Sequence, residues 1–401
     1  MSTPPEHECW QWVRQTLDSI DAQGLLRHDA ASDFAQPGTS VQRHIGGAPV
    51  VNFCSNDYLD LSRHPHVVEA ARAAADRYGT GATASRLVYG TLPVHHELEH
   101  ALAQFKGTPA ALLFSSGYMA CVGVVRALLH AAPAATPVYF DRLSHASLID
   151  ASTQNNRHWR SFAHNSIAAL EALLSKRPAT AWPSAIVVTE GVFSMDGDVA
   201  PLREISELCA RHHAILVVDD AHGTGVTGPG GRGTATLAGI AAHPHLVQIG
   251  TLSKALGSQG GFVACSAIVR QLLLNAARTM IFDTGLNPVS AAAVLAALQQ
   301  LQSQPDLHRR LTENITLFRR LIRRDADPVP TPIVPIILGE PAHALHAAAA
   351  LLQRGLLVSA IRPPTVPPGT SRLRVTITAG HTHTQLRTLA EAITESITIN
   401  N

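Results

Sequence analysis

The middle of the chain alternates short apolar runs with longer helix-like segments, and this alternation limits the fold more than any other feature. The short runs are rich in β-branched or apolar residues and have the length of buried strands. Strands that alternate with helices pair in parallel in one sheet, with the helices on its faces. We therefore expect an α/β fold with a mainly parallel sheet, whose strands lie at residues 111–114, 138–140, 185–189, 215–218, 247–249 and 262–264.

The two ends of the chain predict two further parts of the molecule, an N-terminal arm and a C-terminal domain. A helix-like stretch at 10–26 and a polar segment containing Pro37 and Gly38 are typical of an arm. After a long helical region at 289–324 and a proline-rich connector, the order strand, helix, strand, strand, helix predicts a small α+β domain, with its main elements at 333–338, 342–353, 357–361 and 373–378. We predict an N-terminal arm at 1–55, a large domain at 56–288, and a connecting helix with a small C-terminal domain at 289–401.

Composition excludes several classes of protein. The 401 residues, 46% of them hydrophobic, can bury a large core, and a net charge of +1 argues against nucleic acid as a partner. No uninterrupted apolar run approaches the roughly 18 residues of a membrane span, and Glu6 and Glu8 precede any apolar run. Five scattered cysteines form neither a disulfide framework nor a metal site. We expect a soluble cytoplasmic protein with reduced, mostly buried thiols and no membrane partner.

Lys254 is the most informative single residue, because it ends an apolar strand-like run and is followed by glycine. An ammonium group in this position either binds an anion or forms a Schiff base. Earlier in the chain, another buried-strand pattern ends in Asp219, with His222 just beyond it. Open parallel sheets bind their ligands at the carboxyl ends of the strands. We therefore expect these three side chains to hold one ligand.

The three residue types are those that pyridoxal phosphate chemistry requires. The cofactor needs a lysine amine for its aldehyde carbon, a carboxylate that keeps its pyridine nitrogen protonated, and a donor for its phenolate oxygen. A lysine nucleophile must also be partly neutral, which a desolvated site beside cationic groups favours. Each residue alone has a plainer interpretation, since a strand-end Asp219 is usually a turn former and His222 could be a loop residue. Together they indicate a pyridoxal phosphate site.

Longer segments carry a family resemblance. They run in order from about residue 17 almost to the C-terminus, and the most specific are NFCSNDYL (52–59), DRLSHASL (141–148), VTEGVFSMDGD (188–198), VVDDAHGTG (217–225), GTLSKA (250–255) and AIRPPTVPPGTSRLR (360–374). With these motifs the chain resembles the α-oxoamine synthases, a family of the class II pyridoxal-phosphate-dependent aminotransferase superfamily. The resemblance implies fold type I of the pyridoxal phosphate enzymes and a homodimer with a shared active site.

The resemblance also implies roles for the cofactor-binding residues. Lys254 would form the Schiff base and Asp219 would pair with the pyridine nitrogen, while Ser194 and His222 would hydrogen-bond the phenolate oxygen. His145 matches the residue whose ring stacks on the cofactor, and with Lys254 and Asp219 it completes the expected catalytic set. The helical run at 119–130 could hold the phosphate with backbone donors at its start. The expected phosphate contacts are Ser116, Gly117, Tyr118, Thr251 and, on the neighbouring subunit's phosphate, Thr284.

The remaining matches concern substrates. Arg374 matches the arginine that holds the amino-acid carboxylate, a task suited to a planar bidentate donor. Arg27 and Thr365 match acyl-substrate contacts, and Asn56 and His145 lie in active-site segments. The resemblance implies decarboxylative condensation of L-alanine with a pimeloyl thioester to 8-amino-7-oxononanoate, carbon dioxide and free thiol, in biotin biosynthesis. Whether the acyl donor is the coenzyme A or the carrier-protein thioester stays open.

One segment departs from the family's pattern. Where relatives commonly have paired hydroxyl residues followed by prolines, this chain has FDTGLNP at 282–288. Thr284 remains, but Gly285 lacks a hydroxyl, Asp283 adds a negative charge, and Asn287 precedes the proline. We expect weaker binding of the cofactor phosphate than is usual in the family, without loss of function.

Alternatives remain at two levels. Within the family, 5-aminolevulinate synthase, 2-amino-3-ketobutyrate coenzyme A ligase and serine palmitoyltransferase run the same chemistry on other substrates. From another class, His96, Glu97 and His100 match the zinc-peptidase pattern, although no acidic residue follows between Glu99 and Asp141 as a further ligand. A glycine pattern at 223–228 matches the dinucleotide motif but runs into Pro-Gly-Gly, which cannot open the required helix. A scaffold that binds the cofactor without turnover is the last alternative.

Overall fold

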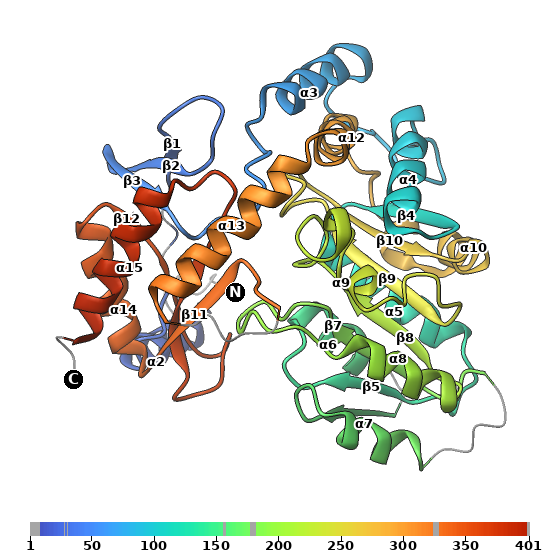
Figure 1. Ribbon diagram of the computed structural model, residues 1–401. Helices are drawn as coiled ribbons and strands as arrows, with labels where there is room; N and C mark the ends of the chain where they lie inside the picture. The colour runs from blue at the N-terminus through green and yellow to red at the C-terminus, as the bar shows by residue number, and fades with distance from the viewer. Residues whose placement is uncertain are drawn as a thin grey trace, which may run out of the picture.

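The computed structural model describes residues 9–27, 29, 31–154, 158–176, 182–323 and 329–398. In Figure 1 a larger domain and a smaller one lie side by side, joined by the helices that follow the large domain's sheet. The large domain contains a seven-stranded sheet of order β4-β10-β9-β8-β7-β5-β6. Its strands are β4 Ala110–Phe114, β5 Val138–Asp141, β6 Trp159–Phe162, β7 Ile186–Glu190, β8 Ile215–Asp219, β9 Leu246–Thr251 and β10 Gly261–Cys265.

The expected α/β fold is confirmed, and all six predicted strands are present. β5 pairs in parallel with β6 and β7, and the parallel ladder continues through β8 to β9, whereas β10 is antiparallel to both β4 and β9. The sequence missed β6, because three of its four residues are exposed and it lies at the edge of the sheet. An edge strand of this kind lacks the continuous apolar run of a buried parallel strand.

Helices cover both faces of this sheet (Figure 1). Alternate residues of each strand face opposite sides, so Val188 and Val217 join the core under α5 while Val187 and Leu216 join the core under α8. Burial on both faces explains why the strands are apolar throughout. The helices of this domain are α3 Pro65–Tyr78, α4 Pro93–Lys106, α5 Gly117–Ala131, α6 Ala146–Thr153, α7 Ile167–Leu174, α8 Leu202–Arg211, α9 Thr234–Leu237, α10 Ala267–Ala276, α11 Arg278–Ile281 and α12 Pro288–Ser303, with a short 3₁₀ turn at Pro229–Gly231.

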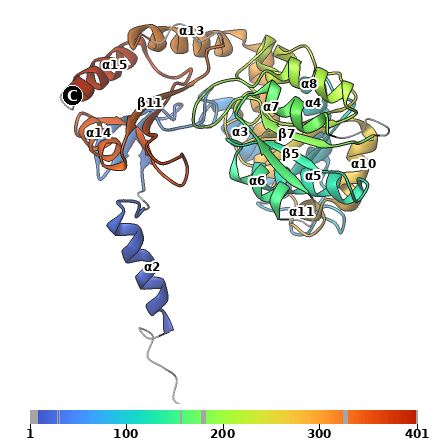
Figure 2. The same ribbon diagram turned by 90° about the horizontal axis from the view of Figure 1, so that it is seen from below.

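The C-terminal domain follows the predicted order of elements, except that the single strand expected at 357–361 is two short strands, at 356–357 and 359–361, which belong to different sheets. Three antiparallel strands, in the order β11-β14-β13, pack with two helices. A second sheet of order β1-β2-β3-β12 draws residues 33–52, which the sequence assigned to an arm, into this domain. The elements are β1 Asp33–Phe34, β2 Gln42–Ile45, β3 Ala48–Asn52, β11 Ile333–Gly339, α14 Pro341–Gln353, β12 Leu356–Leu357, β13 Ser359–Ile361, β14 Ser371–Thr376 and α15 His383–Thr398. The N-terminal helix α2, Gln11–Ala22, has no buried residue and projects from the body in Figure 2.

The long helical region expected at 289–324 is present, but it consists of two helices rather than one connecting helix. α12 ends at Ser303, and α13, Pro305–Leu321, begins at a proline. Proline is favoured in the first turn of a helix, but in the interior it removes a backbone donor and clashes with the preceding turn. α12 packs on α3 and α4 of the large domain, whereas α13 packs on α15 of the small domain. The break therefore coincides with the passage between domains.

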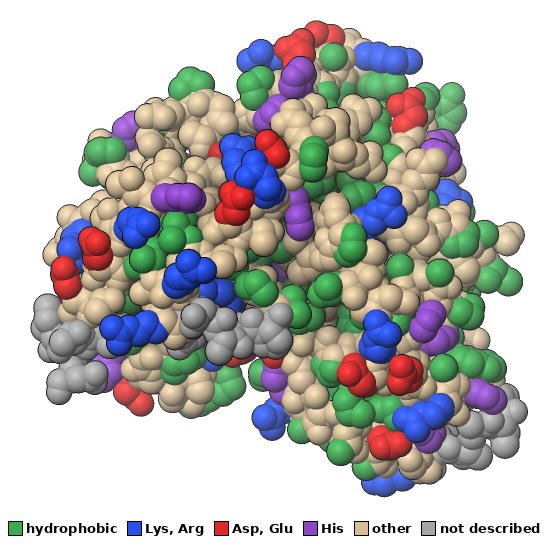
Figure 3. Space-filling model, in the orientation of Figure 1, with side chains coloured by type: hydrophobic (Ala, Val, Ile, Leu, Met, Phe, Trp, Pro, Cys, Tyr) green, Lys and Arg blue, Asp and Glu red, His purple; other side chains and the backbone are tan. Residues whose placement is uncertain are grey.

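On the face shown in Figure 3, acidic and basic side chains are interspersed, and neither sign of charge dominates. Cys121, Cys209 and Cys265 are buried, in agreement with the expectation for most of the thiols. Within the described ranges, no helix has both the length and the apolar character that crossing a bilayer requires.

Candidate active site

The carboxyl ends of three neighbouring parallel strands meet at one edge of the large sheet. Glu190 ends β7, Asp219 ends β8 and Thr251 ends β9, and Lys254 follows three residues later. A cavity of about 260 Å³ opens at this edge. The cavity is lined by Ser116, Gly117, Tyr118, Cys121, His145, Ser147, Glu190, Asp219, Ala221, His222, Thr251, Ser253 and Lys254. The structure thus brings together eight of the residues that the sequence singled out.

A chain of short hydrogen bonds starts at Lys254. Its Nζ lies 2.7 Å from His222 Nε2, and His222 Nδ1 lies 2.6 Å from the hydroxyl of Tyr58. Burial lowers the pKa of Lys254, although Asp219 and Glu190 oppose this shift. Burial, together with the charges of Lys254 and Arg374, holds the pKa of His222 well below its usual value. His222 is therefore a neutral imidazole beside an amine that loses its proton more readily than a free lysine does.

Tyr58 extends this chain toward the small domain. Its side chain is fully buried, and burial raises the pKa of its hydroxyl to about 12. The same hydroxyl lies 3.2 Å from Asn56 Oδ1, which also accepts a hydrogen bond from Arg374. The sequence analysis gave Tyr58 no role, although it lies two residues after Asn56 in a motif that was recognised. That proximity was the available signal.

Asp219 is held at the bottom of the cavity by local donors. Its Oδ1 accepts a hydrogen bond from the backbone amide of Ala221 at 2.9 Å, and its Oδ2 lies 3.3 Å from the sulfur of Cys121. Cys121 comes from α5, and the carboxylate and burial both raise the pKa of its thiol, burial more strongly. The thiol is thus a neutral donor to Asp219. The sequence analysis also missed this contact, because the two residues are far apart in the chain.

The start of α5 forms another wall. Ser116 caps this 15-residue helix by accepting a hydrogen bond from the amide of Met119. Gly117 packs closely on Thr251, since a Cβ at position 117 would lie 3.2 Å from the Thr251 side chain. A helix N-terminus with an adjacent hydroxyl is a ready anion site. Tyr118 also lines the cavity, but its hydroxyl donates to Asp150.

His145 stands at the N-terminus of α6. Its Nδ1 accepts a hydrogen bond from the amide of Ser147 at 3.2 Å and lies 2.8 Å from that residue's hydroxyl. These contacts fix the orientation of the ring, which remains accessible at the cavity. Burial lowers the pKa of His145. The charge of Asp219 raises this pKa and the charge of Lys254 lowers it, both less strongly than burial does. A neutral ring held in this way offers a flat face to a ligand.

Arg374 reaches the site from β14 of the small domain. Its Nε donates to the backbone oxygen of Ser194 at 2.7 Å, and its Nη1 donates to Asn56 Oδ1 at 3.2 Å and to Thr376 Oγ1 at 3.0 Å. Its side chain is buried. Three predicted residues, Arg374, Ser194 and Asn56, are thus brought together where the two domains meet.

Arg27 and Thr365 form a separate pair. Arg27 Nη2 lies 3.4 Å from Thr365 Oγ1 and 3.4 Å from the backbone oxygen of Pro363. The two residues are far apart in the sequence, and neither lines the cavity. The arm and the Pro-Pro-Thr segment therefore meet at this pair.

Thr284 lies outside the cavity of its own chain. It is exposed and forms an isolated bridge with Ser85. Its neighbour Asp283 accepts a hydrogen bond from Ser115, next to the cap of α5. A Cβ at Gly285 would lie 2.7 Å from the backbone oxygen of Gly90, so packing favours glycine there.

The zinc-peptidase pattern lies on α4, where His96, Glu97 and His100 are all exposed and the acid between the histidines that has ion-pair partners is Glu99, outside the motif. Glu99, between the two histidines, pairs with Arg86 at 3.0 Å and with Arg270 at 2.9 Å. His100 lies 2.8 Å from the amide of Gln104. Within the described ranges, no group of three or more metal-binding side chains comes together. The histidines of this motif belong to a packed helix.

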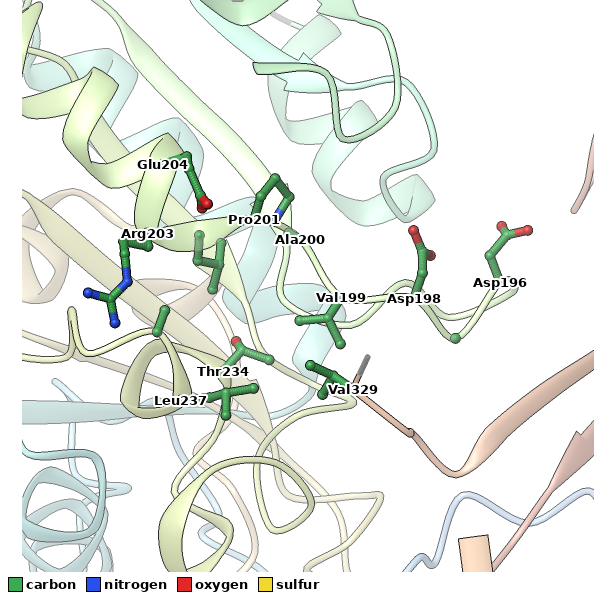
Figure 4. Close-up of a pocket in the computed structure, with 13 residues that line it drawn as sticks. Asp196, Asp198, Val199, Ala200, Pro201, Arg203, Glu204, Thr234, Leu237 and Val329 are labelled. Atoms are coloured by element: carbon green, nitrogen blue, oxygen red, sulfur yellow. The ribbon is translucent and has the colours of Figure 1, made fainter. Parts of the chain in front are cut away.

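A second cavity, of about 400 Å³, is lined in part by residues 196–204 (Figure 4). Val199, Leu237 and Val329 line its middle, with Arg203 and Glu204 on one side and Asp196 and Asp198 on the other. It contains none of the strand-end residues that form the first cavity. This second cavity is larger than the first, but it lacks the residues that a reactive site requires.

A family match gives the class of protein to which the chain belongs. The family model "Aminotransferase class I and II" matches residues 48–393, so the chain belongs to this family. More particularly, a putative 8-amino-7-oxononanoate synthase of Desulforudis audaxviator is 44% identical over 96% of this chain and 99% of its own length. The 8-amino-7-oxononanoate synthase of Methylococcus capsulatus is 46% identical over 88% of this chain and 90% of its own.

Solved structures agree with this placement. A serine palmitoyltransferase from S. paucimobilis with bound PLP–myriocin aldimine superposes with a TM-score of 0.88 at 30% identity, covering 98% of both chains. The 8-amino-7-oxononanoate synthase of Francisella tularensis gives a TM-score of 0.74 at 27% identity, covering 88% of this chain and 98% of its own. Pyridoxal phosphate is the cofactor of this class of enzyme, as the sequence predicted, and the amine, strand-end carboxylate and helix N-terminus of the first cavity fit its reactive groups.

Proposed function

We propose that the protein condenses L-alanine with a pimeloyl thioester and releases carbon dioxide and free thiol, giving 8-amino-7-oxononanoate for biotin synthesis. The observation that carries this proposal is the identity of 42–46% to proteins of that name over about nine tenths of the chain. The serine palmitoyltransferase structures superpose well but are only about 30% identical. The closer sequence match favours the alanine and pimeloyl reaction over its sister activities.

Lys254 would hold the cofactor and then move a proton. When bound, pyridoxal phosphate supplies a conjugated ring that accepts the electron pair left at the α-carbon of the amino acid. The lowered pKa of Lys254 lets its freed amine take the α-proton and later return it to the product. The neutral His222, fixed by Tyr58, orients that amine through Nε2.

The other residues of the cavity would bind and orient the cofactor. Asp219 would hold the proton on the pyridine nitrogen, with Cys121 and the amide of Ala221 keeping the carboxylate in place. Ser194 and His222 would donate to the phenolate oxygen. The start of α5, together with Thr251, would bind the phosphate, and His145 would stack on the ring. Thr284 would serve the phosphate of a neighbouring subunit in a homodimer.

Arg374 would bind the amino-acid carboxylate, with Asn56 beside it. The guanidinium already donates to Ser194 and Asn56, so its direction is set before substrate arrives. Arg27 and Thr365 would contact the acyl chain. The new carbon–carbon bond would join the α-carbon to the thioester carbonyl, the thiolate would depart and take a proton from solvent, and the carboxylate held by Arg374 would leave as carbon dioxide. A proton from Lys254 replaces it.

The proposal extends to assembly and location. A single chain leaves Thr284 exposed and outside its own cavity, which supports a homodimer in which this residue reaches the partner's site. The substrates are soluble biosynthetic intermediates, which fits a cytoplasmic enzyme. Either the coenzyme A or the carrier-protein thioester can supply the pimeloyl group.

Substrate competition tests the function. The cofactor-loaded enzyme is mixed with L-alanine, glycine or L-serine and a pimeloyl thioester, and thiol release, carbon dioxide and the mass of the product are followed. We expect turnover to be highest with L-alanine and to yield 8-amino-7-oxononanoate. Preference for glycine or serine would assign a sister activity, and cofactor binding without turnover would indicate a scaffold.

A further inference from the structure

Glu190 is a buried carboxyl group that the proposed cycle does not use. It ends β7, has 2% of its surface exposed and lines the cavity. Its Oε2 accepts a hydrogen bond from the amide of Ser194 at 3.2 Å. Its Oε1 is buried and has no hydrogen-bond partner among the described residues. A buried polar atom left in this way costs free energy unless a ligand or water satisfies it.

A second carboxylate lies on the next strand. Glu190 is the register partner of Asp219, so the two acids end adjacent parallel strands at the same edge. Two neighbouring buried carboxylates do not both stay ionised, because like charges in a low dielectric repel each other strongly. The partners of Asp219, two hydrogen-bond donors, stabilise its charged form. Glu190 has only backbone donors, the amides of His145 and Ser194, and it is the more deeply buried of the two acids, so it is the one expected to keep a proton.

The other charged and titratable groups of the cavity support this division. Burial raises the pKa of Glu190 well above its usual value, and Asp219 adds to the rise, while Lys254 opposes it. His145 has a pKa lowered by burial, His222 is neutral, and the Cys121 thiol is protonated. Among the described residues that line the cavity, no cation other than Lys254 is therefore available to neutralise a second carboxylate.

We propose that Glu190 is a further residue of the active site, a neutral acid that donates a hydrogen bond from Oε1 into the cavity beside Asp219. Its acceptor is the polar ring bound there, or a water held between the ring and the protein. Through Oε2 the same side chain also fixes Ser194, whose backbone oxygen binds Arg374. Glu190 thereby links cofactor binding to the position of the substrate arginine. This inference rests on the cofactor site of the proposed function but not on the identity of the acyl substrate.

Two substitutions of similar shape separate a neutral donor from the alternatives. E190Q keeps an uncharged donor and a carbonyl acceptor, whereas E190M fills the same space without either. We expect E190Q to bind pyridoxal phosphate within about threefold of the parent enzyme, and E190M to bind it roughly tenfold more weakly, as for one lost hydrogen bond. Affinity is measured by titrating the cofactor-free protein and following the visible absorbance.

Infrared difference spectroscopy provides a readout that needs no turnover. The parent holoenzyme minus E190Q should show the carbonyl stretch of a protonated carboxyl group, and circular dichroism checks that both variants fold. If E190Q binds as weakly as E190M, and the difference spectrum shows only carboxylate bands, Glu190 is ionised and the proposal is wrong. It is equally wrong if E190M binds like the parent. Failure of the alanine assay would leave these results unchanged, so the two proposals are tested separately.

Discussion

The bottom of the cavity and the acyl-contact pair are built differently. At the bottom, Lys254 and His222 follow the ends of β9 and β8, and hydrogen bonds of 2.6 to 2.7 Å join them to each other and to the buried Tyr58. The pair Arg27 and Thr365 lies on non-regular segments of the arm and the small domain, with a contact of 3.4 Å. Strand ends in a packed sheet hold reactive groups rigidly, whereas exposed segments adapt more easily. The proposed chemistry therefore has a preformed site, whereas the proposed acyl contacts lie on parts of the chain that can vary.

The segment at 194–198 connects the large domain with β14 of the small domain. Ser194 contacts Arg374, and Asp196 pairs with Arg372 at 2.6 Å, both arginines on β14. On the other side, Asp198 lies 2.8 Å from His164 of the large domain. The positions of the cavity and of the substrate arginine thus depend on one short segment.

The largest effect is expected at the bottom of the cavity. Lys254→Ala removes both the covalent attachment of the cofactor and the base, so kcat should fall by about 10⁴-fold or more. Product formation with saturating cofactor measures this, and Lys176→Ala, an exposed lysine, is the control. Residual activity above a few per cent would show that another group moves the proton.

The next largest effect is expected at Arg374, which lies where the two domains meet. Arg374→Lys keeps the charge but loses the planar fork, so the KM for L-alanine should rise 10- to 100-fold. The KM for the thioester should change little. Steady-state kinetics in each substrate separates the two, with the exposed Arg387→Lys as control. Equal losses for both substrates would contradict a role specific to the amino acid.

A pH effect is expected where the 194–198 segment joins the large domain. Burial alone would lower the pKa of His164, but Asp141 and Asp198 raise it to about 10. A raised pKa stabilises the folded state fully below about 6.5, the unfolded value, and this stabilisation disappears as the pH rises through about 10. We expect the free energy of unfolding to fall by roughly 1–2 kcal/mol between pH 7 and 10, since Asp198 is partly exposed.

Chemical denaturation across this pH range measures the effect. His164→Gln should unfold more readily at pH 7 and lose less stability toward pH 10, because it cannot carry the charge. The exposed His383→Gln serves as control. A parallel pH dependence in His164→Gln and the parent would assign the change to other groups.

A smaller effect is expected at the acyl-contact pair. Arg27→Ala should raise the KM for the pimeloyl thioester about three- to fivefold and leave kcat nearly unchanged, because an exposed contact of this length contributes little. Arg14→Ala, an exposed arginine of α2, is the matched control. A large drop in kcat would mean that the arm takes part in the chemistry and would remove the contrast between the two regions.

The smallest effect tests the departure at 282–288. Asp283→Asn removes a negative charge whose side chain contacts Ser115, next to the cap of α5, so the cofactor should bind roughly two- to fourfold more tightly. Cofactor titration measures this, with Asp76→Asn as control. Replacing Gly285 by serine is a poorer test, since its Cβ would meet the backbone of Gly90. Unchanged affinity in Asp283→Asn would show that this charge does not weaken phosphate binding.

The sequence predicted the large sheet well because its strands are buried on both faces and its motifs lie directly at their ends. The residues around Lys254 and Asp219 could be found for this reason, and eight of the predicted residues line one cavity. Edge strand β6 and the pairing of β3 with β12 carry weaker signals, since exposed or short strands lack a clear apolar pattern.

Contacts between distant residues were harder to predict. The contact of Cys121 with Asp219 and the pairing of Glu190 with Asp219 depend on sheet order, which a single sequence does not give. Tyr58 was overlooked although it lies in a recognised motif, because its partner His222 is 164 positions away. The residue types of the site were predictable, and their mutual contacts were not.

The break between α12 and α13 has a mechanical consequence. Pro305 has no amide hydrogen, so the helical ladder is interrupted where the chain leaves the large domain, and Gln304 takes a non-helical backbone conformation there (φ −122°, ψ 78°). α12 packs on the large domain and α13 on α15 of the small domain, yet residues of both helices belong to one apolar cluster that also contains side chains of both domains. A change of angle at Gln304 would therefore repack that shared cluster, so the break redirects the chain between the domains without uncoupling them.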